Sequence, residues 1–269
     1  MRSPAATLDL RSALSKEVRA ALAVLSGESI TGKAVHRCRV RLKRARALAR
    51  VGRACAPGLA AVFNESARAV MTDLGEARDL VALSAFAREA AGQAQGKKAA
   101  SAIAAVADAL ERVRANKPSP DLDATRAGLR DLLAMAQVWP EASTRQLTKG
   151  AERIARRARQ AQRSGEGSNA ADDRHEWRKR EKDRLYAMSL LDAAWPSERK
   201  RRRRKSEALA DLLGRERDAR LLAEKIKREP ALAGGEQAAR RARSTLKRTL
   251  KRLSRKADAL GQEVHAGRA

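Results

Sequence analysis

Five basic residues between positions 36 and 50 are spaced so that one face of a helix could hold an anion. At about 100° per residue, their side chains fall within about 80° of a helical wheel. The five are His36, Arg39, Lys43, Arg46 and Arg50, here called the first basic stripe. Imidazole and ammonium groups donate hydrogen bonds to phosphate oxygens, and the planar guanidinium donates two at once. Cys38 and Leu42 lie beside the stripe on the wheel, so the stripe is predicted to border the buried side of its helix.

A related pattern returns 139 residues later in the chain. Residues 36–83 align with residues 175–222 without a gap, with 12 identities in 48 positions. A chain rich in Ala and Arg matches itself by chance at about one position in ten, and the residues shared here include His, Gly, Pro and Asp. We interpret the chain as a tandem duplication, with repeats over residues 1–140 and 141–269 that together form one domain. An internal pseudo-twofold axis is expected to relate them.

The second repeat carries a matching stripe. Its members are His175, Arg178, Lys182 and Tyr186. A charged stripe is more often a solvated helix face, and a single histidine is more often a core residue than a ligand. Here two of the three histidines head equivalent stripes, which favours a shared function. Arg41 and Arg180 also match but fall on the far side of the wheel, where solvation or a salt bridge is expected.

Further basic residues accompany the stripes. Those on residues 147–159 follow i, i+4, i+7, i+8 spacing and either extend the binding surface or form an exposed face. They are Lys149, Arg153, Arg156 and Arg157. The segments 74–79 and 213–218 share Leu-Gly-x-x-Arg-Asp. Here glycine is predicted to end one helix, at Gly75 as a left-handed cap, and aspartate to favour the next. Arg78 and Arg217 could still point towards the anion.

The overall charge indicates a strongly anionic partner. There are 59 Lys and Arg against 32 Asp and Glu, which leaves +27. This excess suits nucleic acid, an acidic membrane surface or a phosphate polymer. The densest basic run, residues 199–205, has no basic counterpart in the first repeat. It is therefore predicted to be peripheral and to serve non-specific attraction of polyanions or solubility.

The expected environment is a reducing cytoplasm, without membrane association. No apolar stretch approaches 18 residues, and the N-terminus has no apolar signal core. Cys38 and Cys55 are predicted to lie about 25 Å apart along one helix, beyond the reach of a disulfide.

Helices must position all of these residues. Ala, Leu, Arg, Lys and Glu dominate the chain, aromatic residues make up 2% of it, and no segment has the pattern of a strand. Helical periodicity and its breaks predict helices over residues 6–25, 32–55, 59–74, 76–92, 97–115, 122–138, 143–163, 172–194, 198–213, 216–228 and 236–262. The predicted fold class is all-α, with two antiparallel helical bundles.

The segments HRCRVRLKRAR at 36–46 and HEWRKREKDRLY at 175–186 resemble the two signatures of the CHAD family, the conserved histidine α-helical domain. The two Leu-Gly-x-x-Arg-Asp segments are also similar to that family, and the resemblance covers almost the whole chain. It implies two helical bundles with pseudo-twofold symmetry and inorganic polyphosphate as ligand, threaded along a central basic surface. Carried over by position, the ligand-facing residues are His36, Arg39, Lys43, Arg46, His175, Arg178, Lys182 and Tyr186. Many members have Arg where this chain has Leu185, so the two halves are expected to grip unequally.

These observations predict a non-enzymatic protein that binds inorganic polyphosphate, with polyphosphate granules as a destination. The alternative is a non-specific nucleic-acid-binding or architectural protein, although the scarcity of aromatic residues leaves few stacking platforms. No catalytic, metal or cofactor site is expected. There is no P-loop, Lys179 breaks the H-E-x-x-H motif that would begin at His175, and the aligned repeat keeps only Asp79 and Asp218 as acidic groups.

Overall fold

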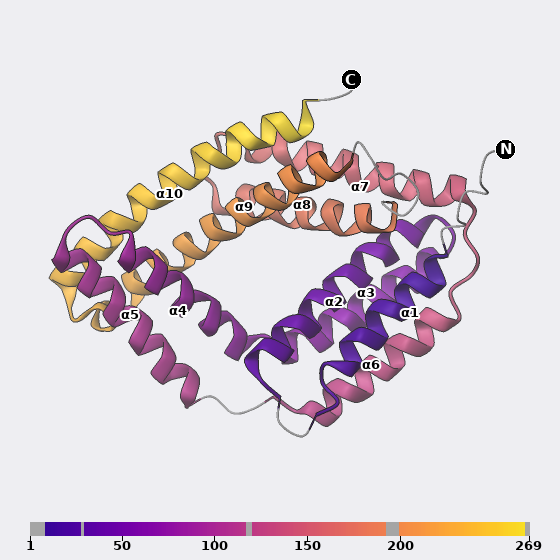
Figure 1. The fold of residues 1–269 in the computed structure, drawn as a ribbon, viewed down its shortest axis with the longest axis horizontal. Coiled ribbons are helices and arrows are strands. Elements are labelled where there is room, and N and C mark those ends of the chain that lie inside the picture. Colours follow the sequence, from indigo (N-terminus) through magenta and orange to yellow (C-terminus); the bar gives the residue numbers. More distant parts are fainter. Residues whose placement is uncertain (1–8, 28–29, 117–119, 192–198, 267–269) are drawn as a thin grey trace. The chain divides into compact units, whose positions relative to one another are not determined.

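The computed structural model describes residues 9–27, 30–116, 120–191 and 199–266, without the side chains of residues 76–78, 189–191 and 199–202. In these residues the chain forms ten α-helices, two short 3-10 helices and no strand (Figure 1). The α-helices are α1 (Leu10–Ala23), α2 (Gly32–Val51), α3 (Pro57–Asp73), α4 (Glu76–Gly92), α5 (Lys97–Ala115), α6 (Leu122–Gln137), α7 (Thr144–Gly165), α8 (Ala171–Leu191), α9 (Arg199–Arg228) and α10 (Glu236–His265). The 3-10 helices are η1 (Gly52–Ala54) and η2 (Pro230–Ala233). The all-α prediction is confirmed.

Capping side chains and a proline mark where three helices begin, and the start of α2 at Gly32 is the one predicted from the sequence. At the start of α1, Asp9 accepts a hydrogen bond from the backbone N of Ser12 (3.0 Å). At the start of α2, Thr31 accepts one from the backbone N of Ala34 (3.2 Å). These bonds satisfy amides that have no partner within the helix. Pro57 begins α3, where its fixed φ and missing amide are tolerated.

The two Leu-Gly-x-x-Arg-Asp segments fold differently: a helix ends just before Gly75 as predicted, but the left-handed cap predicted at Gly75 and the helix end predicted at Gly214 are wrong. Gly75 follows the end of α3 but is not among the glycines with positive φ, so it is no left-handed cap. In the second repeat the two helices predicted over 198–213 and 216–228 are the single helix α9, which passes through Gly214. Glycine costs a helix only about 1 kcal/mol. Leu213 and Glu216, on either side of Gly214, are buried. Packing of these side chains offsets the cost of the glycine, and α9 continues past it.

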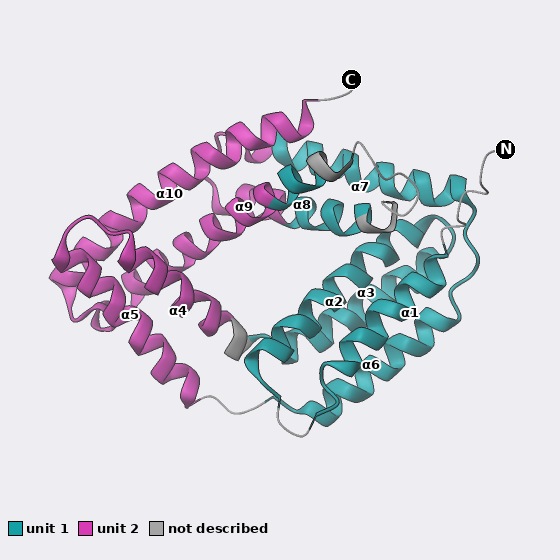
Figure 2. Cartoon of the chain, in the orientation of Figure 1, with its two compact units in different colours: residues 1–75, 120–163, 179–207 teal, residues 76–119, 164–178, 208–269 magenta. Residues whose placement is uncertain are grey.

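The chain forms two compact units, which are described separately (Figure 2). Unit 1 comprises residues 1–75, 120–163 and 179–207. In it α1 packs against α2 and α6, and α3 packs against α2 and α6. Ile154 of α7 and Ala187 of α8 join the same core. Phe63 and Trp139 are fully buried there, with their ring centroids 5.8 Å apart in an edge-to-face arrangement.

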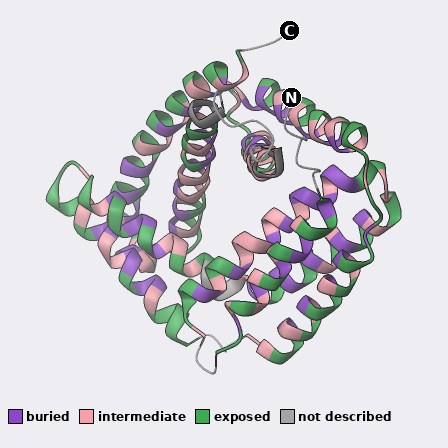
Figure 3. Cartoon of the chain, turned by 45° about the vertical axis from the view of Figure 1, so that its right-hand side comes forward, coloured by how far each residue is buried: buried purple, intermediate pink, exposed green. Residues whose placement is uncertain are grey.

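Helix α2 turns its apolar face into the core of unit 1 (Figure 3). Cys38, Leu42, Ala45 and Ala49 are all fully buried, so the seam predicted beside the first basic stripe is confirmed. Burial raises the pKa of the Cys38 thiol to about 12, against the opposing effect of Arg39. Both cysteines are free. The prediction that one helix carries both is wrong, because α2 ends at Val51 and Cys55 follows η1.

Unit 2 comprises residues 76–119, 164–178 and 208–269. Helices α4 and α5 form a helical hairpin, joined by residues 93–96. Helix α10 and η2 pack against α5. Ile103 and Leu110 of α5, Leu222 of α9 and Leu246 of α10 are buried together in its core. Aliphatic side chains make up most of this core, and Phe86 of α4 is its aromatic member among the described residues.

Each unit takes helices from both halves of the sequence. The compact units consequently differ from the predicted repeats, 1–140 and 141–269, and the repeats and the pseudo-twofold axis stay predictions. None of the described helices combines the length and the apolar character needed to cross a membrane.

Candidate functional site

A pocket in unit 1 is lined by five arginines. It has a volume of about 220 Å³, and its lining comes from the end of α2, η1, the first turns of α3, and α7 and α8. The arginines are Arg50, Arg53, Arg153, Arg157 and Arg180, and we call the site the arginine pocket. Asp183 is the acidic residue in its lining. One carboxylate thus faces five guanidinium groups, which leaves a formal excess of four positive charges.

Contacts among the lining residues position these arginines. Arg50 Nη1 donates to Asp183 Oδ1 (2.5 Å), and Arg180 Nη1 lies 3.6 Å from Asp183 Oδ2. Arg153 Nη2 donates to the backbone carbonyl of Arg50 (3.1 Å), close to the end of α2. Because carbonyls at a helix C-terminus attract cations, this contact holds the side chain of Arg153, which belongs to α7, against the end of α2. Three helices are thereby linked around the pocket.

The charge of the arginine pocket is only partly compensated by the protein. Burial lowers the pKa of Arg153, and repulsion from Arg53 and Arg157 acts in the same direction. Burial also raises the pKa of Asp183, against the opposing effect of Arg50. An anion that enters the pocket would relieve the repulsion among its cations.

Arg46, one turn before Arg50 on α2, is a second poorly compensated cation. Its Nε is buried and has no hydrogen-bond partner among the described residues, and its Nη1 lies 3.9 Å from the thioether of Met71, a weak acceptor. Burial, then repulsion from Arg50, lowers the pKa of Arg46 to about 10, with Asp183 opposing and Arg68 adding to the shift. Arg46 therefore stays charged at neutral pH in surroundings that disfavour the charge.

The other members of the first basic stripe differ in burial. His36 is exposed, and Lys43 is half-buried. Arg39 donates from Nη1 to the backbone carbonyl of Met71, near the end of α3. A Cβ added to Gly75 would lie 3.1 Å from the same Nη1, so this glycine leaves room for Arg39. The structure thus gives Arg39 a structural contact besides its predicted role as a ligand-facing residue.

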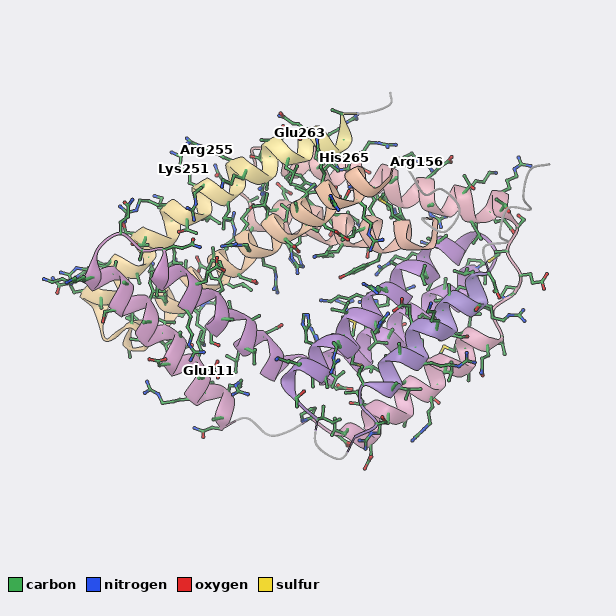
Figure 4. All side chains as sticks on the ribbon, viewed as in Figure 1. Glu111, Arg156, Lys251, Arg255, Glu263 and His265 are labelled. Atoms are coloured by element: carbon green, nitrogen blue, oxygen red, sulfur yellow. The ribbon has the colours of Figure 1, made fainter. Side chains whose placement is uncertain are left out.

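The four basic residues predicted on α7 divide into two pairs. Arg153 and Arg157 line the arginine pocket. Lys149 and Arg156 are exposed on the same helix, and Arg156 is labelled in Figure 4. The spacing of basic residues on α7 therefore predicted two residues that line the pocket and two that lie on the exposed part of the helix.

Two candidates of the second stripe belong to unit 1. Lys182 and Tyr186 are half-buried on α8. The Tyr186 ring centroid lies 6.0 Å from the guanidinium carbon of Arg44, a cation–π contact with α2. Tyr186 thus packs beside the helix that carries the first basic stripe.

The run 199–205 is only partly described. Arg203 and Arg204 are exposed, and Arg203 Nε lies 3.0 Å from Glu207 Oε1, one turn further along α9. The side chains of residues 199–202 lie outside the described part. None of the described residues of this run lines the arginine pocket.

Unit 2 has a pocket of its own, with a volume of about 250 Å³. His175 and Arg217, two predicted site residues, line it together with Arg174 and Arg220. Its lining also includes two acidic residues, Asp172 and Glu216. The cations of this pocket therefore have acidic neighbours within the same lining.

Arg174 shows how unit 2 compensates a buried charge. Its side chain is 4% exposed, and its Nε donates to both carboxylate oxygens of Glu216 (2.9 and 3.1 Å). It also forms an ion pair with Asp258 and lies over the ring of Trp177, 4.9 Å from the centroid. Burial alone would lower the pKa of Arg174, but the hydrogen bonds to Glu216 and Asp258 raise it overall.

The remaining candidates lie in unit 2. Arg178 is half-buried on α8, and a Cβ added to Gly214 would lie 3.9 Å from its Nε. Arg217 Nη1 lies 3.8 Å from Asp218 Oδ1. Arg78 lies in α4, but its side chain is outside the described residues. Gly75 and Gly214 thus each lie beside an arginine of a basic stripe, Arg39 and Arg178 respectively. The distance is shorter in unit 1.

Two lining residues of the arginine pocket were not predicted as ligands. Arg53 lies in η1, beyond the end of α2, where the helical wheel no longer applies. Arg180 was assigned to solvation or a salt bridge; its ion pair with Asp183 confirms the salt bridge, but it also lines the pocket. The sequence signal for Arg53 was the cluster of arginines near the end of the helix that carries the first basic stripe.

No group of three or more His, Cys, Asp or Glu side chains suited to a metal ion occurs in the part of the chain that the structure describes. The guanidinium groups that line the arginine pocket offer chemistry for anions.

Comparisons with known proteins agree with the helical architecture. The family model of the CHAD domain matches residues 9–227. The crystal structure of the CHAD domain from the plant Ricinus communis is similar over 100% of this chain and 97% of its own, with a TM-score of 0.64 and 21% sequence identity. None of the curated proteins matches the chain. Because the family match spans most of its length, the chain belongs to the CHAD family.

Proposed function

We propose that this protein binds inorganic polyphosphate without acting on it as an enzyme, and that the arginine pocket and the first basic stripe form the main binding surface. The chain carries a CHAD domain, and that family is associated with polyphosphate binding. The observation that carries the proposal is the arginine pocket, in whose described lining five arginines occur with one aspartate.

Guanidinium groups suit the oxygens of a phosphate chain. Each can donate two parallel hydrogen bonds, and a hydrogen bond between charged groups contributes about 1.5–3 kcal/mol. Arg46 and Arg153 are already partly removed from water in the folded protein. A phosphate group that pairs with them therefore gains interaction without a further large cost of desolvating these arginines.

The dimensions of the site favour a slender polymer. A pocket of about 220 Å³ admits individual phosphate groups, whereas a nucleic-acid duplex is far wider, with a major groove alone of about 12 Å. Along α2, His36 and Arg50 are separated by about 21 Å at 1.5 Å per residue. A chain of linked phosphates can follow this stripe and place one or more groups in the pocket.

The acidic groups at the site argue for binding and against catalysis. Phosphoryl transfer generally uses carboxylates that hold Mg²⁺. Asp183 is already paired with Arg50 and Arg180, so a magnesium ion would have to displace those cations. A protein of this kind would be recruited to polyphosphate granules in the cytoplasm.

The test replaces two exposed arginines of the pocket. Arg53→Gln combined with Arg157→Gln removes two charges from residues that are exposed, so the fold is expected to survive. Affinity for polyphosphate of about 100 units, measured by competition with a labelled polymer at about 0.15 M salt, should fall at least ~10-fold. Wild-type affinity should also rise with polymer length.

The matched control removes two exposed cations of α1. Lys16→Gln combined with Arg19→Gln lowers the net charge equally but leaves the pocket intact, and its affinity should fall less than ~2-fold. Equal losses in the two double variants would mean that net charge, and not the arginine pocket, determines binding.

A further inference from the structure

Helix α10 carries a second cationic surface, separate from the arginine pocket. Between Glu236 and Asp258 it has no acidic residue, and all nine of its basic residues there are exposed. They are Arg240, Arg241, Arg243, Lys247, Arg248, Lys251, Arg252, Arg255 and Lys256. The CHAD family model ends at residue 227, before this helix begins. From this surface we infer that unit 2 binds the backbone of a nucleic-acid duplex, independently of its sequence.

Seven of the nine basic residues of α10 form two rows along the helix. One row has i, i+4 spacing and comprises Arg243, Lys247, Lys251 and Arg255. The other comprises Arg248, Arg252 and Lys256. Lys251 and Arg255 extend from the side of α10 turned away from α4 and α5 (Figure 4). A helix with cations on both flanks can meet the phosphates on either side of a groove.

The partners of these side chains leave their charge uncompensated. Arg248 donates to the hydroxyl of Thr245 (3.3 Å), and Arg252 donates to the amide oxygen of Gln93 (3.1 Å). Both acceptors are neutral. Among the described residues, no ion pair involves any of the nine cations. The surface is therefore available to an external polyanion along its whole length.

The charge density of α10 matches that of a duplex. The nine cations extend over about 24 Å at 1.5 Å per residue. A duplex carries one phosphate per 1.7 Å of axis, which makes about 14 phosphates over the same length. About half of these face one side, so phosphates and cations are present in comparable numbers.

Other polyanions fit α10 less well. Insertion at a membrane surface needs a free apolar helix face, but Ala242, Leu246, Leu253 and Ala257 are buried within unit 2. Single-stranded nucleic acid binds through aromatic stacking, and α10 has no aromatic residue of the Phe, Trp or Tyr type. An exposed convex helix also offers a slender polymer no pocket.

The experiment compares two variants of the full chain with equal net charge. The α10 variant carries Arg243→Gln, Lys247→Gln, Lys251→Gln and Arg255→Gln. The control variant carries Lys16→Gln, Arg19→Gln, Lys33→Gln and Arg37→Gln, all exposed in unit 1. Gln has nearly the helix propensity of Lys and Arg, and circular dichroism checks that both variants fold.

Three probes separate the possible partners: a random-sequence DNA duplex of about 30 base pairs, polyphosphate of about 100 units, and vesicles with anionic phosphatidylglycerol. Duplex affinity should fall at least ~10-fold in the α10 variant, with a salt dependence shallower by about 2–4 in log–log slope, and less than ~3-fold in the control. Polyphosphate affinity of the α10 variant should stay within ~3-fold of wild type.

Three results would overturn the inference. Equal loss of duplex binding in both variants would mean that net charge, and not the surface of α10, determines duplex binding. Loss of vesicle binding with duplex binding unchanged would assign α10 to a lipid surface, and loss of polyphosphate binding alone would assign it to that polymer. The Arg53/Arg157 double variant should keep its duplex affinity within ~3-fold, so failure of this inference and failure of polyphosphate binding in unit 1 are distinguishable.

Discussion

In unit 2 the buried guanidinium of Arg174 meets two carboxylates, whereas in unit 1 the half-buried side chain of Arg46 meets a thioether and other cations. Arg174 pairs with Glu216 and Asp258, and the pairing raises its pKa. The pKa of Arg46 is lowered to about 10 by burial and by repulsion from Arg50. The same chemical group is thus stabilised by its surroundings in one unit and destabilised in the other.

The difference separates arginines that serve the fold from those suited to a ligand. A buried ion pair costs several kcal/mol when one partner is removed, because the other charge remains buried. Arg46 is half-buried and has the more distant charge of Asp183 as its acidic partner among the described residues, so it already carries part of that cost in the folded protein. An external anion can recover part of it, and in unit 1 the lining of the arginine pocket includes Arg50, one turn along α2 from Arg46.

The largest effect is expected at Arg174. Arg174→Met removes the main cation of the buried Glu216, which keeps only a longer contact with Arg220 (3.4 Å) among the described residues. The free energy of unfolding should therefore fall by about 3–5 kcal/mol, measured by chemical denaturation. The control Arg217→Met removes a more exposed pair with Asp218 and should cost less than about 1 kcal/mol. Unchanged stability in Arg174→Met would remove the contrast between the units.

Replacing Arg46 should change the free energy of unfolding in the opposite direction. Arg46→Met removes a poorly compensated buried charge and keeps an apolar side chain of similar length, so the free energy of unfolding should rise by about 1 kcal/mol. Polyphosphate affinity should fall ~10-fold, since a charged hydrogen bond is lost. A variant that is less stable than wild type would show that the protein itself compensates Arg46.

The two shared glycines sharpen the comparison further. A Cβ at Gly75 would lie 2.8 Å from the backbone oxygen of Thr72 and close to Arg39, so Gly75→Ala should destabilise the protein by about 1–2 kcal/mol. At Gly214 the nearest atom is 3.9 Å away and the backbone is helical. Gly214→Ala should therefore stabilise by about 0.5–1 kcal/mol. Thermal denaturation of both variants tests the opposite signs.

The smallest effect is expected in the pocket of unit 2. His175→Gln combined with Arg217→Gln should lower polyphosphate affinity less than ~3-fold, because acidic residues already accompany the cations there. A competition assay beside the Arg53/Arg157 double variant measures the ratio. A loss as large as that of the unit 1 variant would show that the two pockets contribute equally.

Most helices could be predicted from the sequence because periodicity and caps are local. The helix predicted over 97–115 coincides with α5, and Thr31 caps α2 as expected. The break expected at Gly214 was wrong, since the same Leu-Gly-x-x-Arg-Asp pattern ends a helix near Gly75 and continues one in α9. Tertiary packing, which is not visible in a local motif, decides between the two.

The candidate site was only partly predictable for a related reason. Arg50, Arg153 and Arg157 followed from helical spacing, and all three line the arginine pocket. Arg53 did not, because its position depends on the η1 turn after α2. Arg180 was placed on the far face of its helix, but in the folded protein it lines the pocket together with Arg153 and Arg157 of α7.

The two cysteines make the arginine pocket open to site-directed labelling. Cys38 is fully buried and its thiol has a pKa of about 12, so at neutral pH it reacts slowly with maleimides. Cys55 is partly exposed and lies two residues after Arg53. The wild-type chain, without any substitution, can thus carry one fluorophore near the pocket, and its emission would follow the arrival of a phosphate polymer in real time.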